Sequence, residues 1–174
     1  LGNFYKLSLK KGKIYTDVAS ELQHVESYLK IEQIRCSHSF LYTIKCPPEC
    51  MNETIIKIIL QPIAENAVLH GIRGYSKQGY IHITCRAEDG FLVFQVFNNG
   101  FPLDPKMAES VNSGFADNNG SFGFGIRNVY QRLQLYYKGT ASIHYSVNDG
   151  TLVTIKIPVT ASSVFSSPDS LPHT

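Results

Sequence analysis

The chain has little net charge of either sign. Its 16 Lys and Arg residues nearly balance its 14 Asp and Glu residues, for a formal net charge of +2. A protein that binds nucleic acid through its phosphates usually concentrates Lys and Arg strongly on one face. The sequence therefore gives no indication of a nucleic-acid partner.

Long hydrophobic runs are also missing. No apolar stretch approaches the roughly 20 residues that a membrane-spanning helix needs, and no signal peptide opens the sequence. At 174 residues and 43% hydrophobic side chains, the chain is long enough to bury a sizeable core. We expect one compact domain with an additional helical segment, with no part of it in contact with a membrane.

The four cysteines form no Cys-x-x-Cys pair and lack the spacing of zinc ligands; they are Cys36, Cys46, Cys50 and Cys85. Cys46 and Cys50 flank Pro-Pro-Glu and would form a disulfide only in an oxidising compartment. We expect reduced thiols, as in a cytosolic protein.

Hydrophobic periodicity predicts the order of elements. The predicted helices are 17–36, with Asp17 as N-cap, about 52–71, and 125–138. The predicted strands are 39–46, 80–86, 91–97, 141–147 and 151–158. Only one face of each strand is strictly apolar, so we expect a two-layer α/β sandwich: a mixed, mostly antiparallel sheet with helices on one face, preceded by a helical segment. Residues 101–122 and the tail from 160 onward read as flexible.

A polar stripe marks the apolar predicted helix that contains Leu60-Gln-Pro-Ile-Ala-Glu-Asn-Ala-Val-Leu-His-Gly-Ile-Arg73. Asn66, His70 and Arg73 share one side of an α-helix at about 100° per residue. Asn supplies a neutral oxygen that Mg²⁺ accepts, while His and Arg can meet phosphate oxygens. The stripe predicts a site for a metal-bound polyanion. The alternative is an amphipathic helix whose polar side faces water.

Two glycine-containing segments follow. Val96-Phe-Asn-Asn-Gly100 ends a predicted strand, and Gly123-Phe-Gly125 opens a strongly periodic helix. Glycine lets the backbone approach a ligand closely, and a helix N-terminus favours negatively charged phosphate. Gly-x-Gly also occurs in dinucleotide-binding folds, but the strand–helix–strand unit that those folds need near the N-terminus is missing here.

Taken in order, these segments resemble the Asn box and the two Gly boxes of the GHKL (Bergerat) ATP-binding fold. Leu-Gln-Pro-Ile-Ala-Glu-Asn-Ala-Val-Leu-His-Gly-Ile and Gly-Phe-Gly-Ile-Arg-Asn-Val-Tyr-Gln-Arg-Leu are similar to the boxes of LytS/YesM-type bacterial two-component sensor histidine kinases. The upstream helix from Glu21 to Arg35 is similar as well. The resemblance covers roughly residues 17–158 and implies a HATPase_c catalytic domain that uses ATP and Mg²⁺.

The resemblance also implies roles for individual residues. Asn66 would be the metal ligand, and Glu65, Asn66 and His70 are the candidate catalytic residues. The candidate nucleotide-binding residues are Asn66, His70, Arg73, Asn98, Gly100, Gly123, Gly125, Ile126 and Arg127. Residues 101–122 would form a lid over the nucleotide. Two alternatives stay open: His70 bonded to carbonyls at a helix end, and Arg127 and Arg132 facing solvent.

The first Gly box departs from the family pattern. Asn98 stands where the family usually has an adenine-reading Asp, and Pro102 replaces a second glycine. An amide oxygen can still accept from the adenine amino group, but a carboxylate forms the stronger, charge-assisted bond. We therefore expect weaker adenine binding and reduced selectivity against guanine.

A second departure separates kinase from hydrolase. In the superfamily's hydrolases, a Glu one helical turn before the metal-binding Asn activates water, whereas this chain has Pro62 at that position. Proline cannot act as a base, so phosphoryl transfer to a protein nucleophile is favoured. A GHKL-type ATPase and a degenerate nucleotide-binding scaffold module remain the alternatives.

The phospho-accepting histidine of such kinases is missing, because none of the six histidines has the Pro-His-Phe context. We expect residues 1–36 to end a dimerisation and phosphoacceptor region, 37–160 to form the ATP-binding domain, and 161–174 to form a flexible tail. The implied partners are an upstream phosphoacceptor domain in a homodimeric parent protein and a response regulator. The parent would be a membrane-anchored sensor kinase with this domain in the cytoplasm.

Overall fold

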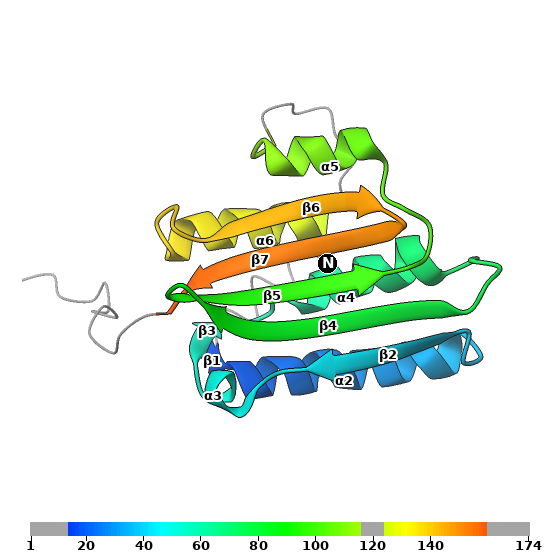
Figure 1. Cartoon of the computed structure of the whole chain (residues 1–174), viewed down its shortest axis with the longest axis horizontal. Helices are drawn as coiled ribbons and strands as arrows, with labels where there is room; N and C mark the ends of the chain where they lie inside the picture. The colour runs from blue at the N-terminus through cyan, green and yellow to red at the C-terminus, as the bar shows by residue number, and fades with distance from the viewer. Residues whose placement is uncertain (1–13, 116–123, 160–174) are drawn as a thin grey trace, which may run out of the picture.

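Two layers make up the described part of the chain: a five-stranded sheet and a set of helices that covers one of its faces (Figure 1). The computed structural model describes residues 14–115 and 124–159. The predicted tail and the residues before 14 lie outside this range. The expected two-layer architecture is confirmed.

The sheet is mixed and mostly antiparallel, as predicted. Its strand order is β2-β4-β5-β7-β6, and only the β2–β4 pair is parallel. The strands are β2 (Phe40–Lys45), β4 (Gly79–Glu88), β5 (Phe91–Asn98), β6 (Ser142–Asn148) and β7 (Gly150–Pro158). Asp89 and Gly90, both with positive φ, make the tight turn between β4 and β5 that Asp-Gly predicts.

The first helix, α2 (Val18–Arg35), begins where the sequence predicts. The Asp17 carboxylate accepts a hydrogen bond from the Ser20 N–H at 2.6 Å and so caps the helix. Its apolar stripe is buried in the same core as the sheet-facing side chains, with Val18, Leu22, Val25 and Leu29 all 5% exposed or less. The helix therefore packs as part of this fold.

The predicted helix at 52–71 is wrong in its extent. The segment instead contains β3 (Thr54–Ile56), a turn, α4 (Gln61–Asn66) and a π-helix, η1 (Ala67–Ile72); a short α3 (Pro48–Met51) precedes it. The β-branched run Thr-Ile-Ile favours a strand, and β3 pairs with β1 (Tyr15–Asp17). Pro62 is tolerated only in the first turn of a helix, so α4 begins beside it.

The stretch 101–122 is also more ordered than predicted where it is described. Asp104 accepts from the Lys106 N–H and caps α5 (Pro105–Asn112). The last helix, α6 (Phe124–Tyr136), buries Ile126, Val129 and Leu133 as expected. No helix among the described residues is long and apolar enough to cross a membrane.

Candidate functional site

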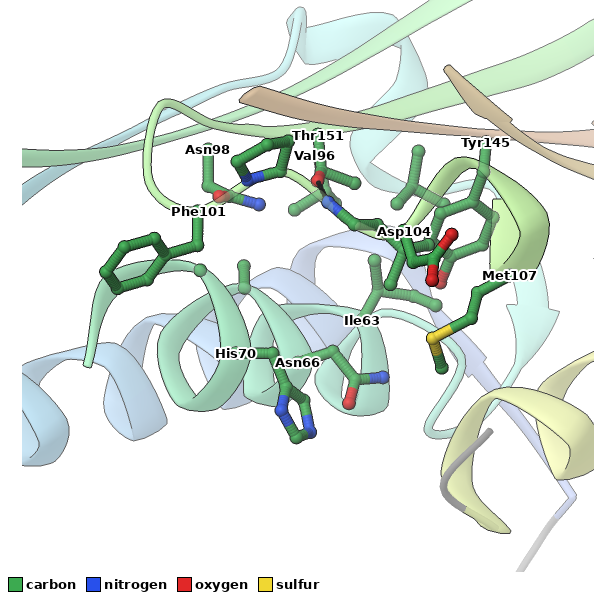
Figure 2. A pocket seen from close by; sticks show the side chains of 15 residues that line it. Ile63, Asn66, His70, Val96, Asn98, Phe101, Asp104, Met107, Tyr145 and Thr151 are labelled. Atoms are coloured by element: carbon green, nitrogen blue, oxygen red, sulfur yellow. Dashed lines mark hydrogen bonds between the residues drawn. The ribbon is translucent and has the colours of Figure 1, made fainter. Parts of the chain in front are cut away.

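A cavity of about 220 Å³ lies between the sheet and the α4–η1 helix, with the α5 segment on one side (Figure 2). The strands β5, β6 and β7 form one wall, and α4 and η1 form the facing wall. Its lining residues are Ile63, Asn66, Ala67, His70, Gly71, Val96, Asn98, Phe101, Pro102, Leu103, Asp104, Met107, Tyr145, Thr151 and Val153. The cavity thus joins two of the three segments that the sequence singled out.

Asn98 and Thr151 are two of the polar groups on the sheet side of the cavity, to which Tyr145 of β6 adds a hydroxyl (Figure 2). Asn98 ends β5 and is only 5% exposed, and its Oδ1 accepts from the Gly100 N–H at 3.3 Å. Thr151 is 7% exposed, and its Oγ1 accepts from the Leu103 N–H at 2.9 Å. This end of the cavity offers amide and hydroxyl groups on an otherwise apolar surface.

Glycines let the loop after β5 lie directly against η1. A Cβ at Gly100 would lie 2.0 Å from the Gly71 carbonyl oxygen, and a Cβ at Gly71 would lie 2.3 Å from Asn98 Oδ1. The Phe101 N–H donates to the same Gly71 carbonyl at 2.8 Å. Gly100 itself does not line the cavity. It allows the close approach that places Asn98 there.

Asn66 and His70 line the helical wall. Asn66 is the last residue of α4, and His70 lies one turn further on in η1. Among the described residues, neither side chain has a hydrogen-bond partner, so the expected alternative of His70 bonded to backbone carbonyls is not observed. In Figure 2 both side chains point away from Asn98, so the two polar ends of the cavity are distinct.

The structure does not bring Arg73 to the cavity. The Arg73 N–H donates to the Val68 carbonyl, an i to i−5 bond, so this turn is a π-helix and the 100° spacing behind the predicted stripe does not hold. The Arg73 guanidinium lies 3.6 Å from Glu32 of α2. The shared stripe therefore ends at His70.

Glu65 and Arg132 also lie outside the cavity lining. Glu65 accepts from the Gln61 side chain at 2.8 Å, one turn earlier on α4. Arg132 is 8% exposed and donates to backbone carbonyls of residues 57 and 58, so it neither faces solvent nor reaches the cavity.

The second Gly box is described only in part. Gly123 lies outside the described residues. Among the described residues, a Cβ at Gly125 would meet only Pro62 Cβ, at 3.4 Å, so packing against them does not demand a glycine. Ile126 is buried in the core at 1% exposure, and Arg127 packs over the Phe115 ring at 5.4 Å from its centroid. None of these three lines the described cavity.

Sequence reasoning missed the residues that close the cavity from α5 and the last two strands: Leu103, Asp104, Met107, Tyr145 and Thr151. Asp104-Pro105 is an N-cap followed by proline in the first turn, a helix-start signal that could have been read. Tyr145 and Thr151 could not have been found, because only the strand register places them over the cavity.

A protein-family model identifies the family to which the chain with this cavity belongs. The model described as "Histidine kinase-, DNA gyrase B-, and HSP90-like ATPase" matches residues 51–161, well over half of the chain. The chain belongs to this family. Its match begins before α4 and ends after β7, so it contains the whole cavity.

Curated relatives narrow the similarity to sensor kinases. Sensor histidine kinase BtsS of Escherichia coli strain K12 is 31% identical over 91% of this chain and 26% of its own length. Sensor protein LytS of Staphylococcus haemolyticus is 27% identical over 91% of this chain and 27% of its own length. Sensor protein kinase HptS of Staphylococcus aureus strain USA300 is 27% identical over 94% and 32%. The chain spans only about a quarter to a third of these relatives.

Solved structures share the fold. The catalytic domain of histidine kinase ThkA matches with a TM-score of 0.63 at 14% identity, over 83% of this chain and 94% of that one. Acinetobacter baumannii histidine kinase AdeS matches with a TM-score of 0.61 at 16% identity, over 92% and 77%. At such low identity these matches establish the fold alone, which is that of histidine kinase catalytic domains.

Proposed function

We propose that the cavity binds Mg²⁺·ATP and that this domain is the catalytic domain of a sensor histidine kinase. The observation that carries the proposal is that one cavity joins Asn98, at the end of β5, to Asn66 and His70, on α4 and η1. A nucleotide needs such a cavity, because its base is apolar with a few polar edges while its phosphates are highly charged.

The sheet end suits a purine base. Val96, Val153 and Ile63 supply apolar contacts, and Asn98 and Thr151 supply polar groups at the edge. A largely apolar site with a few placed polar atoms is the usual form of a small-molecule pocket. At about 220 Å³, the described cavity is smaller than the roughly 300–1,000 Å³ of such pockets. We infer that its sheet end holds the base, and that the phosphates begin at Asn66 and His70 and extend beyond the cavity toward α6.

The helical end suits phosphates and a hydrated metal ion. Among the described residues, no three His, Cys, Asp or Glu side chains come together as a metal cluster. Mg²⁺ needs none when it keeps several waters and takes further oxygens from the phosphates of its nucleotide. The single amide oxygen of Asn66, free of other partners, fits such an ion. His70 would contact the phosphates, as would Arg127 near the start of α6, where the helix dipole favours negative charge.

Transfer to a protein nucleophile fits the arrangement of acids better than hydrolysis does. Pro62 is buried at the position where the hydrolases of the resemblance have their base. Glu65 faces Gln61 outside the cavity lining, and Asp104 is engaged as the N-cap of α5. Asp104 uses one carboxylate oxygen in that cap, and no carboxylate of the described cavity occupies the position of the hydrolases' base.

The acceptor and partners follow from the same proposal. The γ-phosphoryl group would pass to a histidine in a dimeric region upstream of this chain and then to an Asp of a response regulator. The complex of ThkA with the response regulator TrrA has a kinase chain of this fold, with a TM-score of 0.59 at 15% identity over 91% of this chain and 47% of that one. We further propose that the parent protein is anchored in a membrane and that this domain lies in the cytoplasm.

Phosphoryl transfer in trans tests the proposal. With labelled Mg²⁺·ATP, the chain alone should not label itself, and adding the parent's acceptor-containing region should give acid-labile label on that region. An Asn66→Ala variant is the control and should give none. Steady phosphate release without label would establish the ATPase instead, and absence of nucleotide binding would establish a scaffold. Robust self-labelling at His24, the histidine on α2, would contradict the domain assignment.

A further inference from the structure

The turn that leads into α4 is strained. It spans residues 57–60, between β3 and the helix that carries Asn66. Ile58 has a φ of +58°, in the left-handed region that β-branched residues avoid for steric reasons. A backbone conformation of this kind costs on the order of 1–3 kcal/mol and persists only where surrounding groups hold it.

A buried carboxylate from α2 holds this turn on one side. The Glu21 oxygens accept three consecutive backbone N–H groups, from Ile58 at 2.9 Å, Ile59 at 2.9 Å and Leu60 at 3.0 Å. Glu21 is only 4% exposed. Successive N–H groups around a left-handed residue form a concave site for an anion, and the N-terminus of α4 adds a favourable dipole.

A guanidinium from α6 holds the same turn on the other side. Arg132 donates to the Ile58 carbonyl at 2.9 Å and to the Lys57 carbonyl. Both peptide groups of Ile58 are therefore bonded to buried charged side chains, the N–H to Glu21 and the C=O to Arg132. Arg132 is 8% exposed, and this burial lowers its pKa below the ordinary value.

The turn matters because α4 has no cap of its own. Leu60 occupies the N-cap position and makes no side-chain capping bond. The backbone N–H groups of the three residues before α4 donate to the Glu21 carboxylate instead. The position of Asn66, one and a half turns further along α4, therefore depends on a side chain from α2 and another from α6.

We propose that Glu21 and Arg132 are positioning residues: together they fix the turn at 57–60 and, through α4, hold Asn66 and His70 at the phosphate end of the cavity. The inference rests on the proposed function, because it assigns Asn66 to the metal-bound phosphates. It adds that two residues outside the cavity lining fix the geometry of the site: Glu21 on α2 and Arg132 on α6.

A comparison of ATP affinity with and without Mg²⁺ tests the proposal. Titration calorimetry in Mg²⁺ and in EDTA gives the ratio of the two affinities, well below the melting temperature. Glu21→Gln keeps the shape of the side chain but replaces one acceptor oxygen by a donor, so the ratio should fall roughly three- to tenfold. The affinity in EDTA, set by the base end, should stay the same. Glu26→Gln, the same change at a half-buried position of α2 whose carboxylate pairs with Lys30, should leave both affinities unchanged.

A merely structural role would lower the melting temperature without changing this ratio. Arg132→Lys keeps the charge but lacks the fork that reaches two carbonyls, so it should lower the ratio as well. Ile58→Gly removes the strain, since glycine adopts positive φ freely; added to Glu21→Gln, it should restore part of the ratio. If Glu21→Gln does not fold, Arg132→Lys with and without Ile58→Gly answers the same question.

The outcomes separate this inference from the proposed function. Asn66→Ala with an unchanged ratio would remove Asn66 from the metal site and overturn the function on which the inference rests. If Asn66→Ala abolishes the Mg²⁺ dependence while folded Glu21→Gln and Arg132→Lys keep the parent ratio, the function stands and the positioning role is overturned. The positioning role is also overturned if Ile58→Gly, added to Glu21→Gln, restores none of the lost affinity ratio.

Discussion

At the scale of single residues, Asn98 is the least ordinary feature of the site. Its Oδ1 already accepts from the Gly100 N–H and lies against Gly71. The side chain therefore has one oxygen lone pair already in use and an amide N–H₂ that donates. The amino group of adenine donates a hydrogen bond. The Asn98 amide oxygen is a weaker acceptor for that bond than a carboxylate oxygen would be.

An Asn98→Asp variant should bind ATP more tightly. One carboxylate oxygen can keep the Gly100 bond while the other accepts from the adenine amino group. Charged hydrogen bonds contribute about 1.5–3 kcal/mol and neutral ones about 0.5–1.5 kcal/mol. The gain should be on the order of 1 kcal/mol, or several-fold in affinity, less the cost of desolvating the carboxylate. Parallel ATP and GTP titrations measure it.

Discrimination against GTP should rise in the same variant, because guanine offers a carbonyl acceptor where adenine offers its amino group. Asn99→Asp is the matched control: Asn99 is the next residue, its side chain bonds Tyr80 and Gln78, and it does not line the cavity. If Asn98→Asp binds both nucleotides as the parent does, Asn98 does not read the base.

Tyr137 gives a pH dependence to the stability of the fold. It is 6% exposed, and its hydroxyl oxygen accepts from the Ile56 N–H at 3.1 Å. Burial raises the pKa of Tyr137 to about 12, above its ordinary value of 10. Because the pKa is higher in the folded state, the protonated phenol stabilises the fold below pH 10, and this contribution is lost as the pH rises from 10 through 12.

Denaturant unfolding at pH 8 and pH 11 measures this effect. The parent should lose free energy of unfolding between the two, and Tyr137→Phe should lose less, because position 137 then has no phenol to ionise. At pH 8 the variant should be about 1–3 kcal/mol less stable, since the buried Ile56 N–H loses its acceptor. Tyr136→Phe, on the half-buried neighbouring residue, should keep the alkaline loss. Equal losses in parent and Tyr137→Phe would contradict the account.

At the scale of elements, the helix that carries Asn66 shows what a sequence pattern can predict. Hydrophobic periodicity, with Asp17 as the predicted N-cap, correctly predicted the strands β4 and β5, the start of α2 and the helix α6. The pattern did not predict the π-helix η1, because a shift from i−4 to i−5 bonding changes no residue type. Arg73 was misplaced for that reason. The strained turn at Ile58 was also invisible, since its supports come from residues 37 and 74 positions away.

Two glycines of the family boxes should differ in what an added methyl does. In Gly100→Ala the Cβ would lie 2.0 Å from a backbone oxygen of η1, so either the end of β5 or η1 must move. Such overpacking costs about 1–3 kcal/mol, and the melting temperature should fall. In Gly125→Ala the Cβ meets, among the described residues, only Pro62 at 3.4 Å. Alanine also favours a helix, so stability should be kept or rise.

Nucleotide affinity separates the two glycines further. If phosphates approach the backbone at the start of α6, the Gly125→Ala methyl should weaken Mg²⁺·ATP binding in a fully folded protein. Thermal unfolding and titration on the same samples decide this. Gly125→Ala with parent-like affinity would show that the phosphates do not approach the backbone there.

At the scale of the whole molecule, one core serves both the five-stranded sheet and the helix that precedes it. The one-sided apolar alternation of the strands and the resemblance to the GHKL boxes were enough to predict the two-layer α/β fold. They could not predict that α2 would bury its stripe under β2 and α4, or that Glu21 would satisfy the backbone before α4. Such contacts depend on how the elements pack in three dimensions. The cavity walls from β6 and β7 likewise follow from strand register.

The central claim is that Asn66 holds the metal ion of Mg²⁺·ATP in this cavity, and calorimetry on Asn66→Ala tests it most directly. Asn52→Ala, on an exposed residue at the end of α3, is the control. Because Asn66 makes no hydrogen bond to another described residue, its removal should leave the fold intact. We predict that Asn66→Ala loses Mg²⁺-dependent ATP binding while Asn52→Ala keeps it. A folded Asn66→Ala protein with unchanged Mg²⁺·ATP affinity would contradict the account.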